Sequence, residues 1–195
     1  RQMAVQITTA GDAHVYIAVD NASEANSVSS SLSSAGADMS KVRTMIRSTD
    51  TIWIRDYGPR YMYIGDVRAV VDHTYNRPRP NDNAYNAWFA QQLDHAYYEL
   101  PLVHGGGNYH LNSQFRGFAT ELIEDENPAL TEAEIVDIWQ DYQGIDTQIT
   151  DAYPSFVDST QHIDMWLQVT GPQAAVISDW PFNSGSTQDQ VADGL

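Results

Sequence analysis

Runs of apolar residues alternate with polar, turn-rich stretches along the chain, and the run lengths predict strands and helices in alternation. Runs too short for a helix predict buried strands at residues 13–19, 42–46, 51–54, 98–103, 115–123, 162–169 and 174–179. Residues 61–64 and 67–73 predict a hairpin around Gly65 and Asp66, because this pair suits a tight turn.

Other apolar residues recur at helical spacing. Residues 21–36 predict a helix that Gly36 can end, although serines weaken it because they compete for backbone hydrogen bonds. A second helix is predicted to begin at the cap Asp82, and its apolar face would carry Tyr85, Trp88, Phe89, Leu93 and Ala96. Residues 186–195 predict the start of a further helix.

The helix that begins after Thr131 has the clearest boundaries. Thr131 and Glu134 have the spacing of a capping box, in which each side chain bonds to the backbone of the other residue. Gly144 can end the helix, since glycine readily adopts the left-handed conformation found there. The predicted buried face consists of Ile135, Ile138, Trp139 and Tyr142.

Strand pairs alternate with helices at a period of roughly 50–60 residues, which predicts an α/β fold built from repeated ββαβ units. The 195 residues are enough for one domain with a sizeable core, so we expect residues 1–195 to form a single domain. Asp56 and Asp164 lie at predicted strand ends in different units. A repeat fold can bring such side chains together at one centre.

The composition excludes several classes of protein. Lys and Arg number 10 against 26 acidic residues, and the resulting net charge of −16 repels phosphate backbones, so no nucleic-acid partner is expected. No apolar run reaches the roughly 20 residues of a membrane span, so no membrane partner is expected. The absence of cysteine excludes a thiol nucleophile within these residues. An acidic, lysine-poor chain that starts at Arg1 predicts a processed, secreted or periplasmic protein, and it is also typical of high-salt environments.

Two acids and a histidine are candidate catalytic groups. Asp56 follows a predicted strand, and His162 and Asp164 are two residues apart, which places both side chains on one face of a strand. Histidine titrates near neutral pH and can serve as a general acid or base. The alternatives are that Asp56 caps local N–H groups in a turn and that His162 and Asp164 bond only to each other.

Arg77 and Arg79 are candidate anion-binding residues. They lie between prolines that stiffen the segment, so two like charges are held close together and favour an anion; the alternative is a solvated loop. A guanidinium ligand needs carboxylates and an aromatic face, which Trp53 is best placed to supply. Together these residues predict a site for an arginine that bears a free α-carboxylate.

A glycine-rich loop and two further histidines leave other possibilities open. Residues 104–108, His-Gly-Gly-Gly-Asn, allow close approach of a ligand but lack the Lys and Ser/Thr of a phosphate loop. His104, His110, His162 and Asp164 could bind zinc, although their spacing matches no zinc motif. We expect neither a metal nor a cofactor.

The candidate residues lie in motifs that resemble those of bacterial peptidylarginine deiminases, which belong with the agmatine deiminases to the guanidino-group-modifying superfamily. The motifs, in matching order, are Trp-x-Arg-Asp-Tyr at 53–57, Tyr-Asn-Arg-Pro-Arg-Pro-Asn-Asp at 75–82, Gly-Gly-Asn-Tyr at 106–109 and His-Ile-Asp at 162–164. The resemblance implies a five-unit α/β propeller, the pentein fold, with about three units present here. It also implies hydrolysis of an arginine guanidinium to citrulline with release of ammonia.

The resemblance assigns a role to each position. Asp56 and Asp164 would hold the guanidinium, and His162 would be the general acid/base. Arg77 and Arg79 would bind the carboxylate of a C-terminal arginine, and Trp53 and Asn108 would also bind substrate. The family nucleophile is a cysteine near the end of a longer chain, and this chain has none.

We therefore expect residues 1–195 to be the N-terminal part of a peptidylarginine deiminase domain. A C-terminal segment or a second chain would supply the cysteine, and the ligand would be an arginine-containing peptide or a small guanidino compound. Two alternatives remain: an agmatine deiminase-like enzyme, and a non-catalytic module that binds arginine or peptides.

Overall fold

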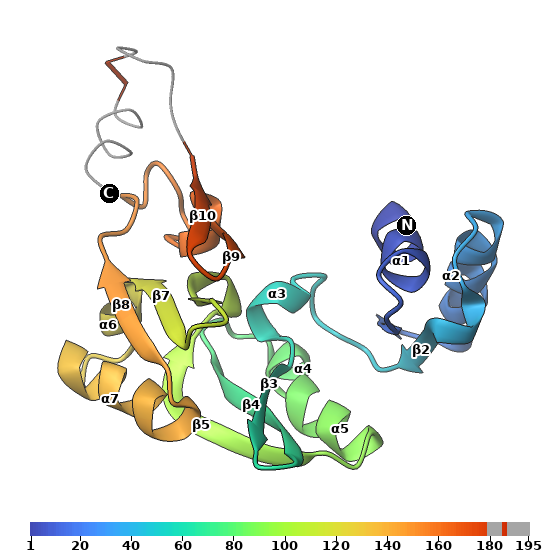
Figure 1. The fold of residues 1–195 in the computed structure, drawn as a ribbon, viewed down its shortest axis with the longest axis horizontal. Helices are drawn as coiled ribbons and strands as arrows, with labels where there is room; N and C mark the ends of the chain where they lie inside the picture. The colour runs from blue at the N-terminus through green and yellow to red at the C-terminus, as the bar shows by residue number, and fades with distance from the viewer. Residues whose placement is uncertain (179–184, 187–195) are drawn as a thin grey trace. The chain divides into compact units, whose positions relative to one another are not determined.

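The computed structural model describes residues 1–178 and 185–186 (Figure 1). By their internal contacts the residues form two compact units, Arg1–Ile52 and Trp53–Leu195. That residues 1–195 form a single domain stays a prediction. Residues 187–195 of the predicted terminal helix lie outside the described residues. Each unit is described below by itself.

The first unit is built around two parallel strands. In chain order its elements are α1 (Gln2–Thr9), β1 (Val15–Val19), α2 (Ala22–Ser34), the 3-10 turn η1 (Met39–Lys41) and β2 (Val42–Ile46). The strands β1 and β2 pair in parallel. Helix α2 begins after Asn21 because the side chain of Asn21 accepts a hydrogen bond from the backbone N of Glu24 at 3.0 Å. The predicted strands and helix of this unit are confirmed, and α1 is additional.

The second unit begins with the short helix α3 (Ile54–Tyr57) and continues into a ββαβ arrangement. Its elements are β3 (Arg60–Ile64), β4 (Val67–Tyr75), the helices α4 (Pro80–Asn83) and α5 (Tyr85–Gln92), and β5 (Ala96–His104). Strand β4 is central: it pairs antiparallel with β3, as the predicted hairpin requires, and parallel with β5. Helix α5 packs along this sheet (Figure 1).

The same arrangement recurs in the following segment. Its elements are β6 (His110–Leu111), β7 (Arg116–Thr120), α6 (Leu122–Glu126), α7 (Glu132–Gln143) and β8 (Asp146–Thr150). Strand β7 is central and pairs antiparallel with β6 and parallel with β8. Two successive sheets of the same design confirm an α/β fold with recurring ββαβ units. The five-unit propeller stays a prediction.

A hydrophobic core joins these two arrangements. Its buried residues are Val71, Leu100, Leu102, Tyr109, Ala119, Ile123, Ile135, Trp139 and Ile145. The ring of Trp139 stacks on that of Tyr109, with centroids 4.5 Å apart. Helix α7 presents Trp139 to the core because the Thr131 capping box and the left-handed Gly144, with φ of 68°, fix both helix ends as predicted.

Two strand predictions beside the candidate residues are wrong. Residues 51–54 form no strand, and the chain enters helix α3 at Ile54. The segment 162–169 begins with the 3-10 turn η3 (Ile163–Met165), and the strand β9 (Leu167–Gly171) follows and pairs with β10 (Ala174–Ile177). His162 and Asp164 therefore do not share the face of a strand. A short apolar run does not distinguish a strand from a buried turn.

Other boundaries also differ from the predictions. Asp82 is buried inside α4 instead of capping a helix, and Ala96 opens β5 instead of extending α5. The strand predicted at 115–123 ends at Thr120, where α6 soon follows. Tyr142, predicted to be buried, is 42% exposed. Strand β8 was not predicted because its sequence, Asp-Thr-Gln-Ile-Thr, has little apolar content.

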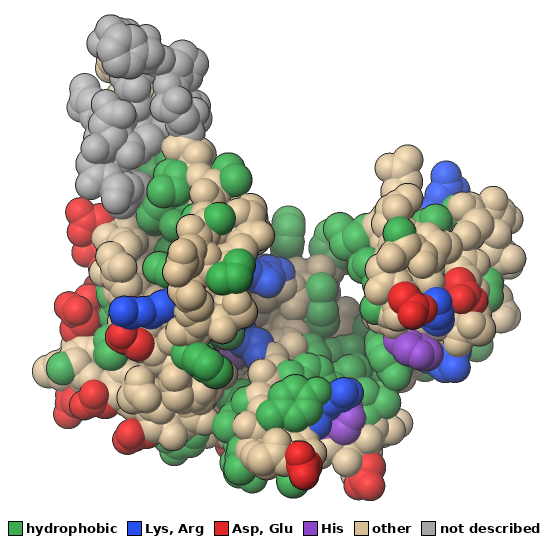
Figure 2. Space-filling view, viewed as in Figure 1, with side chains coloured by type: hydrophobic (Ala, Val, Ile, Leu, Met, Phe, Trp, Pro, Cys, Tyr) green, Lys and Arg blue, Asp and Glu red, His purple; other side chains and the backbone are tan. Residues whose placement is uncertain are grey.

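Acidic side chains are scattered over the visible face of each unit instead of gathering in one patch (Figure 2). Within the described part of the chain, no helix is both long enough and apolar enough to cross a bilayer. The predicted secreted or periplasmic location and the adaptation to salt remain predictions, because neither follows from the fold.

Candidate active site

The sequence analysis assigned a catalytic or substrate-binding role to seven residues, and six of them, all except Asn108, line one cavity of the second unit. The cavity has a volume of about 350 Å³ and is lined by Trp53, Asp56, Tyr75, Arg77, Arg79, Thr160, His162, Asp164 and Met165. The carboxylates and the histidine come from α3 and the start of η3, whereas the arginines come from the segment that follows β4. Tyr75, Thr160 and Met165 were not predicted.

Helix α3 and the strand beneath it hold Asp56 in place. The helix ends at Gly58, whose backbone N donates to the carbonyl O of Ile54 at 2.8 Å; a Cβ on Gly58 would lie only 2.3 Å from that oxygen. His73 of β4 donates from Nε2 to the backbone O of Asp56 at 3.0 Å. Burial lowers the pKa of His73 to about 3, so the ring is neutral and keeps one N–H to donate.

Gly107 marks the point where the candidate catalytic groups meet. Its backbone N donates to Asp56 Oδ1 at 3.2 Å. A Cβ on Gly107 would lie 2.6 Å from His162 Nδ1, 2.7 Å from Asp56 Oδ1 and 2.8 Å from Asp164 Oδ2. Because a single methyl group would touch all three, the two carboxylates and the imidazole surround one point, which the glycine leaves free.

A half-buried arginine shapes the glycine turn η2 (Gly106–Asn108). Arg60 donates from Nη2 to the carbonyl oxygens of Gly106 and Tyr109, and the bond to Tyr109 is 2.6 Å long. Burial lowers the pKa of Arg60 to about 10, which still leaves it charged at neutral pH. Arg60 was not predicted, because its local sequence does not distinguish it from an exposed arginine.

His162 is neutral at rest and flanked by acids. Its side chain is buried, and burial lowers its pKa, although Asp56 and Asp164 act in the opposite direction. His162 Nδ1 lies 3.6 Å from Asp56 Oδ1, and Nε2 is buried without a hydrogen-bond partner among the described residues. The pKa of Asp164 is raised by desolvation of its carboxylate and by the charge of Asp56. The site can therefore accept both a cation and a proton.

Asn108 lies behind the cavity instead of lining it. Its Oδ1 accepts hydrogen bonds from Thr120 N at 3.0 Å and Ile163 N at 3.1 Å. Thr120 Oγ1 lies 2.9 Å from Asn108 Oδ1 and 2.8 Å from the carbonyl O of Gln161, and its single proton can bond to only one of these oxygens at a time. Gln161 has a left-handed φ of 56°. Asn108 thus positions the His162–Asp164 segment, whereas the sequence assigned it to substrate.

The two arginines belong to the same cavity lining. Pro78 and Pro80 flank Arg79, and the backbone N of Arg79 donates to the carbonyl O of Arg77 at 2.8 Å, which closes a tight bend. Arg79 Nη1 donates to the hydroxyl of Tyr75 at 2.9 Å. Trp53 lines the same cavity and is 55% exposed.

The residues proposed for zinc do not gather in one place. His104 stacks on His73 in the core at a centroid distance of 3.8 Å, and His110 Nε2 lies 3.1 Å from Arg55 Nη2. Across residues 1–178 and 185–186, no group of three or more His, Asp or Glu side chains has the geometry of a metal site. Neither His104 nor His110 lines the cavity.

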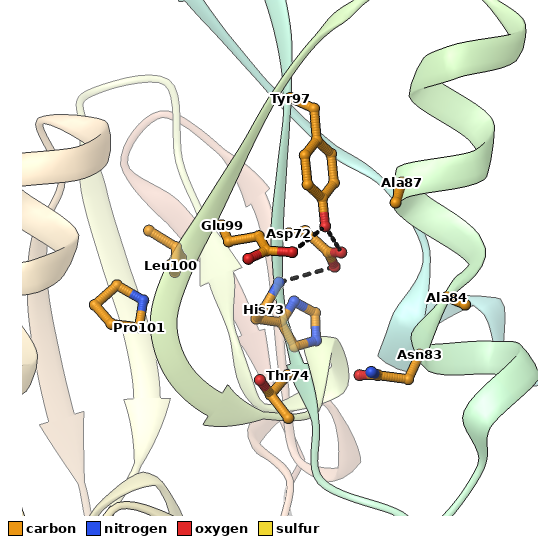
Figure 3. A pocket seen from close by; sticks show the side chains of 10 residues that line it. All are labelled: Asp72, His73, Thr74, Asn83, Ala84, Ala87, Tyr97, Glu99, Leu100 and Pro101. Atoms are coloured by element: carbon orange, nitrogen blue, oxygen red, sulfur yellow. Dashed lines mark hydrogen bonds between the residues drawn. The ribbon is translucent and has the colours of Figure 1, made fainter.

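A second and larger cavity, of about 470 Å³, is lined by residues of β4, β5 and the α4–α5 segment (Figure 3). Its acids are bonded to their neighbours: Tyr97 Oη lies 2.6 Å from Asp72 Oδ2 and 2.9 Å from Glu99 Oε1, and Asp72 Oδ1 accepts from Asn86 Nδ2 at 2.6 Å. One phenol proton can serve only one of the two acids at a time. Burial raises the pKa of Asp72, although its hydrogen bonds to Tyr97, Asn86 and the backbone of His73 act in the opposite direction. This network braces β4 behind His73.

Next to the arginines, Glu126 of α6 forms a pair with Asn76. Asn76 Nδ2 donates to Glu126 Oε1, while Asn76 Oδ1 and Glu126 Oε2 are buried and lack partners among the described residues. Burial raises the pKa of Glu126 to about 7. A protonated Glu126 would supply the missing donor for Asn76 Oδ1 and complete an acid–amide pair.

Replacing Glu126 with glutamine should therefore change how stability depends on pH. Because the folded-state pKa is raised from 4.5 to about 7, the folded protein binds the extra proton and wild-type stability falls as pH rises through this range. Glu126→Gln stays neutral and should gain about 1 kcal/mol over wild type between pH 5 and 7.5, a value reduced for solvent screening. Urea unfolding at several pH values measures this. The exposed Glu132→Gln is the control, and a constant difference between Glu126→Gln and wild type would contradict the pairing.

Comparisons with known proteins identify the family of the chain. The family model of Porphyromonas-type peptidyl-arginine deiminase matches residues 1–193. A relative from Photobacterium profundum, named "Putative agmatine deiminase", is 28% identical over 148 residues, which are 68% of this chain and 41% of the relative. The chain thus spans less than half of the length of this curated relative.

Solved structures show the same fold. A C. jejuni agmatine deiminase with substrate bound, in its C315S form, superposes with a TM-score of 0.78 at 15% identity, covering 99% of this chain and 59% of that one. An Enterococcus faecalis agmatine deiminase gives a TM-score of 0.73 at 18% identity, covering 98% and 56%. At such identities the likeness concerns the fold, and membership rests on the family model. The chain belongs to the Porphyromonas-type peptidyl-arginine deiminase family.

Proposed function

We propose that this chain forms the substrate-binding part of a deiminase that converts a C-terminal arginine of a peptide to citrulline. The observation that carries the proposal is one cavity whose lining holds both groups of charges: Asp56, His162 and Asp164, which meet around Gly107, and the arginines Arg77 and Arg79. The acids match a guanidinium, and the arginines match the α-carboxylate of the same residue.

The reaction requires water to replace one terminal nitrogen of the guanidinium, so that the guanidinium and water give the urea group of citrulline and ammonium. Asp56 and Asp164 would hold the cation and orient its carbon. His162, neutral at rest, would take up a proton from the incoming nucleophile and pass it to the leaving ammonia. In the covalent route, a cysteine thiolate attacks the guanidinium carbon, ammonia leaves, and water then releases citrulline. These 195 residues hold no cysteine, so the thiol would come from further polypeptide.

Agmatine is the second candidate substrate. The relatives found by sequence and the superposed structures carry that name. Agmatine has a guanidinium but no carboxylate, so it would bind only to the carboxylates of Asp56 and Asp164. Two arginines in the lining would then have no anion to bind, and this favours the peptide.

Arg77→Ala should separate the two substrates. We expect the affinity for Nα-acetyl-L-arginine to fall at least tenfold, because a charge-assisted hydrogen bond is worth about 1.5–3 kcal/mol, while the affinity for agmatine changes less than about twofold. Isothermal titration calorimetry with both ligands measures this. Arg68→Ala, an exposed arginine on the same strand as Tyr75, is the matched control. Equal losses for both ligands would refute the carboxylate clamp, and no binding of either would refute the proposed function.

A further inference from the structure

Tyr75 contacts both groups of charges in the cavity, the arginines and the carboxylates. Its hydroxyl accepts a hydrogen bond from Arg79 Nη1 at 2.9 Å and donates to Asp56 Oδ2 at 3.5 Å. The guanidinium carbon of Arg79 also lies 5.9 Å from the centre of the Tyr75 ring. One phenol therefore contacts both an arginine of the clamp and a carboxylate of the cation site.

The fold holds this phenol firmly. Tyr75 is the last residue of β4, it is 5% exposed, and its backbone N donates to Asn83 Oδ1 at 2.7 Å. Its ring packs against Tyr57 of α3 at a centroid distance of 5.8 Å. Because the ring is fixed from the strand side and from α3, the hydroxyl is fixed as well, and the flexible partner is the long side chain of Arg79.

The direction of the two hydrogen bonds follows from one proton. A phenol has a single proton to donate, and an arginine can only donate. The hydroxyl must therefore give its proton to Asp56 and accept from Arg79. Burial and the charge of Asp56 raise the pKa of Tyr75, so the proton stays on the phenol. Hydrogen bonds in such a chain polarise and strengthen one another.

We infer that Tyr75 is a specificity-determining residue, which orients Arg79 toward the carboxylate of the ligand and ties that orientation to Asp56. The inference rests on the proposed function and deepens it, because it assigns the preference for a carboxylate-bearing ligand to a residue outside the arginine pair. A ligand that has both a guanidinium and a carboxylate binds more tightly when Arg79 is already oriented, whereas a ligand without the carboxylate does not.

The test compares two ligands that differ only at the carboxylate, Nα-acetyl-L-arginine and Nα-acetyl-L-argininamide. Calorimetry measures both affinities, and the affinity for the acid divided by that for the amide is the preference ratio of each variant. We expect Tyr75→Phe to reduce the ratio about tenfold through weaker binding of the acid, while affinity for the amide stays within about twofold. In an Arg79→Ala background, Tyr75→Phe should cause no further change in the ratio.

Tyr63→Phe is the matched control. The hydroxyl of Tyr63 also accepts from an arginine, Arg68 Nε at 3.0 Å, but Tyr63 is 62% exposed and does not line the cavity. If the wild-type protein prefers the acid and Tyr75→Phe keeps the full preference, or loses both ligands equally, the role of Tyr75 is refuted while the proposed function stands. If the wild-type protein binds neither ligand, both proposals fail. Should Tyr75→Phe unfold, Arg79→Ala alone must still lower the ratio by the same factor.

Discussion

Replacing Gly107 with alanine should abolish high-affinity binding of guanidino ligands and leave the fold nearly intact. The new methyl group would lie within 2.8 Å of atoms of Asp56, His162 and Asp164. The carboxylate oxygens are at the ends of side chains and Nδ1 belongs to an imidazole ring, so these groups can be displaced at a cost of about 1–3 kcal/mol in stability. The displacement, however, removes the groups from the point on which they converge. We expect the affinity for a guanidino ligand to fall at least tenfold, because a charge-assisted hydrogen bond is worth about 1.5–3 kcal/mol.

The measurements are calorimetric affinity for Nα-acetyl-L-arginine and the urea midpoint of unfolding. Gly171→Ala is the matched control, because a Cβ on this strand residue would meet only Ala174 Cβ at 3.7 Å. That variant should bind like the wild-type protein. If Gly107→Ala retains full affinity, the three groups do not form the cation site.

Replacing Asn108 with alanine should cause the largest loss of stability among the site variants. Its Oδ1 accepts from two backbone N–H groups, those of Thr120 and Ile163. Asn108 is 1% exposed, so water does not replace these bonds. Each buried donor left without a partner costs about 1–3 kcal/mol, and we expect a total of at least about 3 kcal/mol.

The comparison with Asn112→Ala isolates the effect of burial. Asn112 Oδ1 also accepts from two backbone N–H groups, Gln114 N at 2.9 Å and Arg116 N at 3.1 Å, but these bonds lie at the surface. Asn112→Ala should therefore cost less than about 1 kcal/mol, because water can satisfy the donors. Urea unfolding measures both. Similar losses for the two variants would show that Asn108 does not anchor the His162–Asp164 segment.

The sequence predicted the elements whose signals are local. The capping box at Thr131 and the glycine after α7 act within one turn of the helix ends, and the hairpin at Gly65 depends on its own turn residues. Strand β8 carries no such signal, since it pairs with β7 some thirty residues away. The segments at Asp56 and Asp164 looked like strands but are short helical turns, because their hydrogen bonds come from distant residues such as His73 and Asn108.

The sequence predicted the chemical groups of the candidate site and their convergence in one place, but not the contacts that hold them there. The carboxylates, the histidine and the arginine pair follow from what a guanidinium and a carboxylate require. Arg60 and Tyr75 were missed, because their roles consist of bonds to the glycine turn and across the cavity that local sequence does not record. The signal for Tyr75 was its position directly before the Asn-Arg-Pro-Arg segment.

The carboxylates and the arginines of the cavity lie on different kinds of backbone segment. Asp56 and Asp164 sit on turns tied to buried residues, whereas Arg77 and Arg79 belong to a short segment between the end of β4 and the start of α4. Exchange of that segment would change which tail of a ligand is accepted without disturbing the turns that hold its cationic head. Under the proposed function, such a division would let related enzymes acquire new substrates through small peripheral replacements while the reaction itself is inherited unchanged.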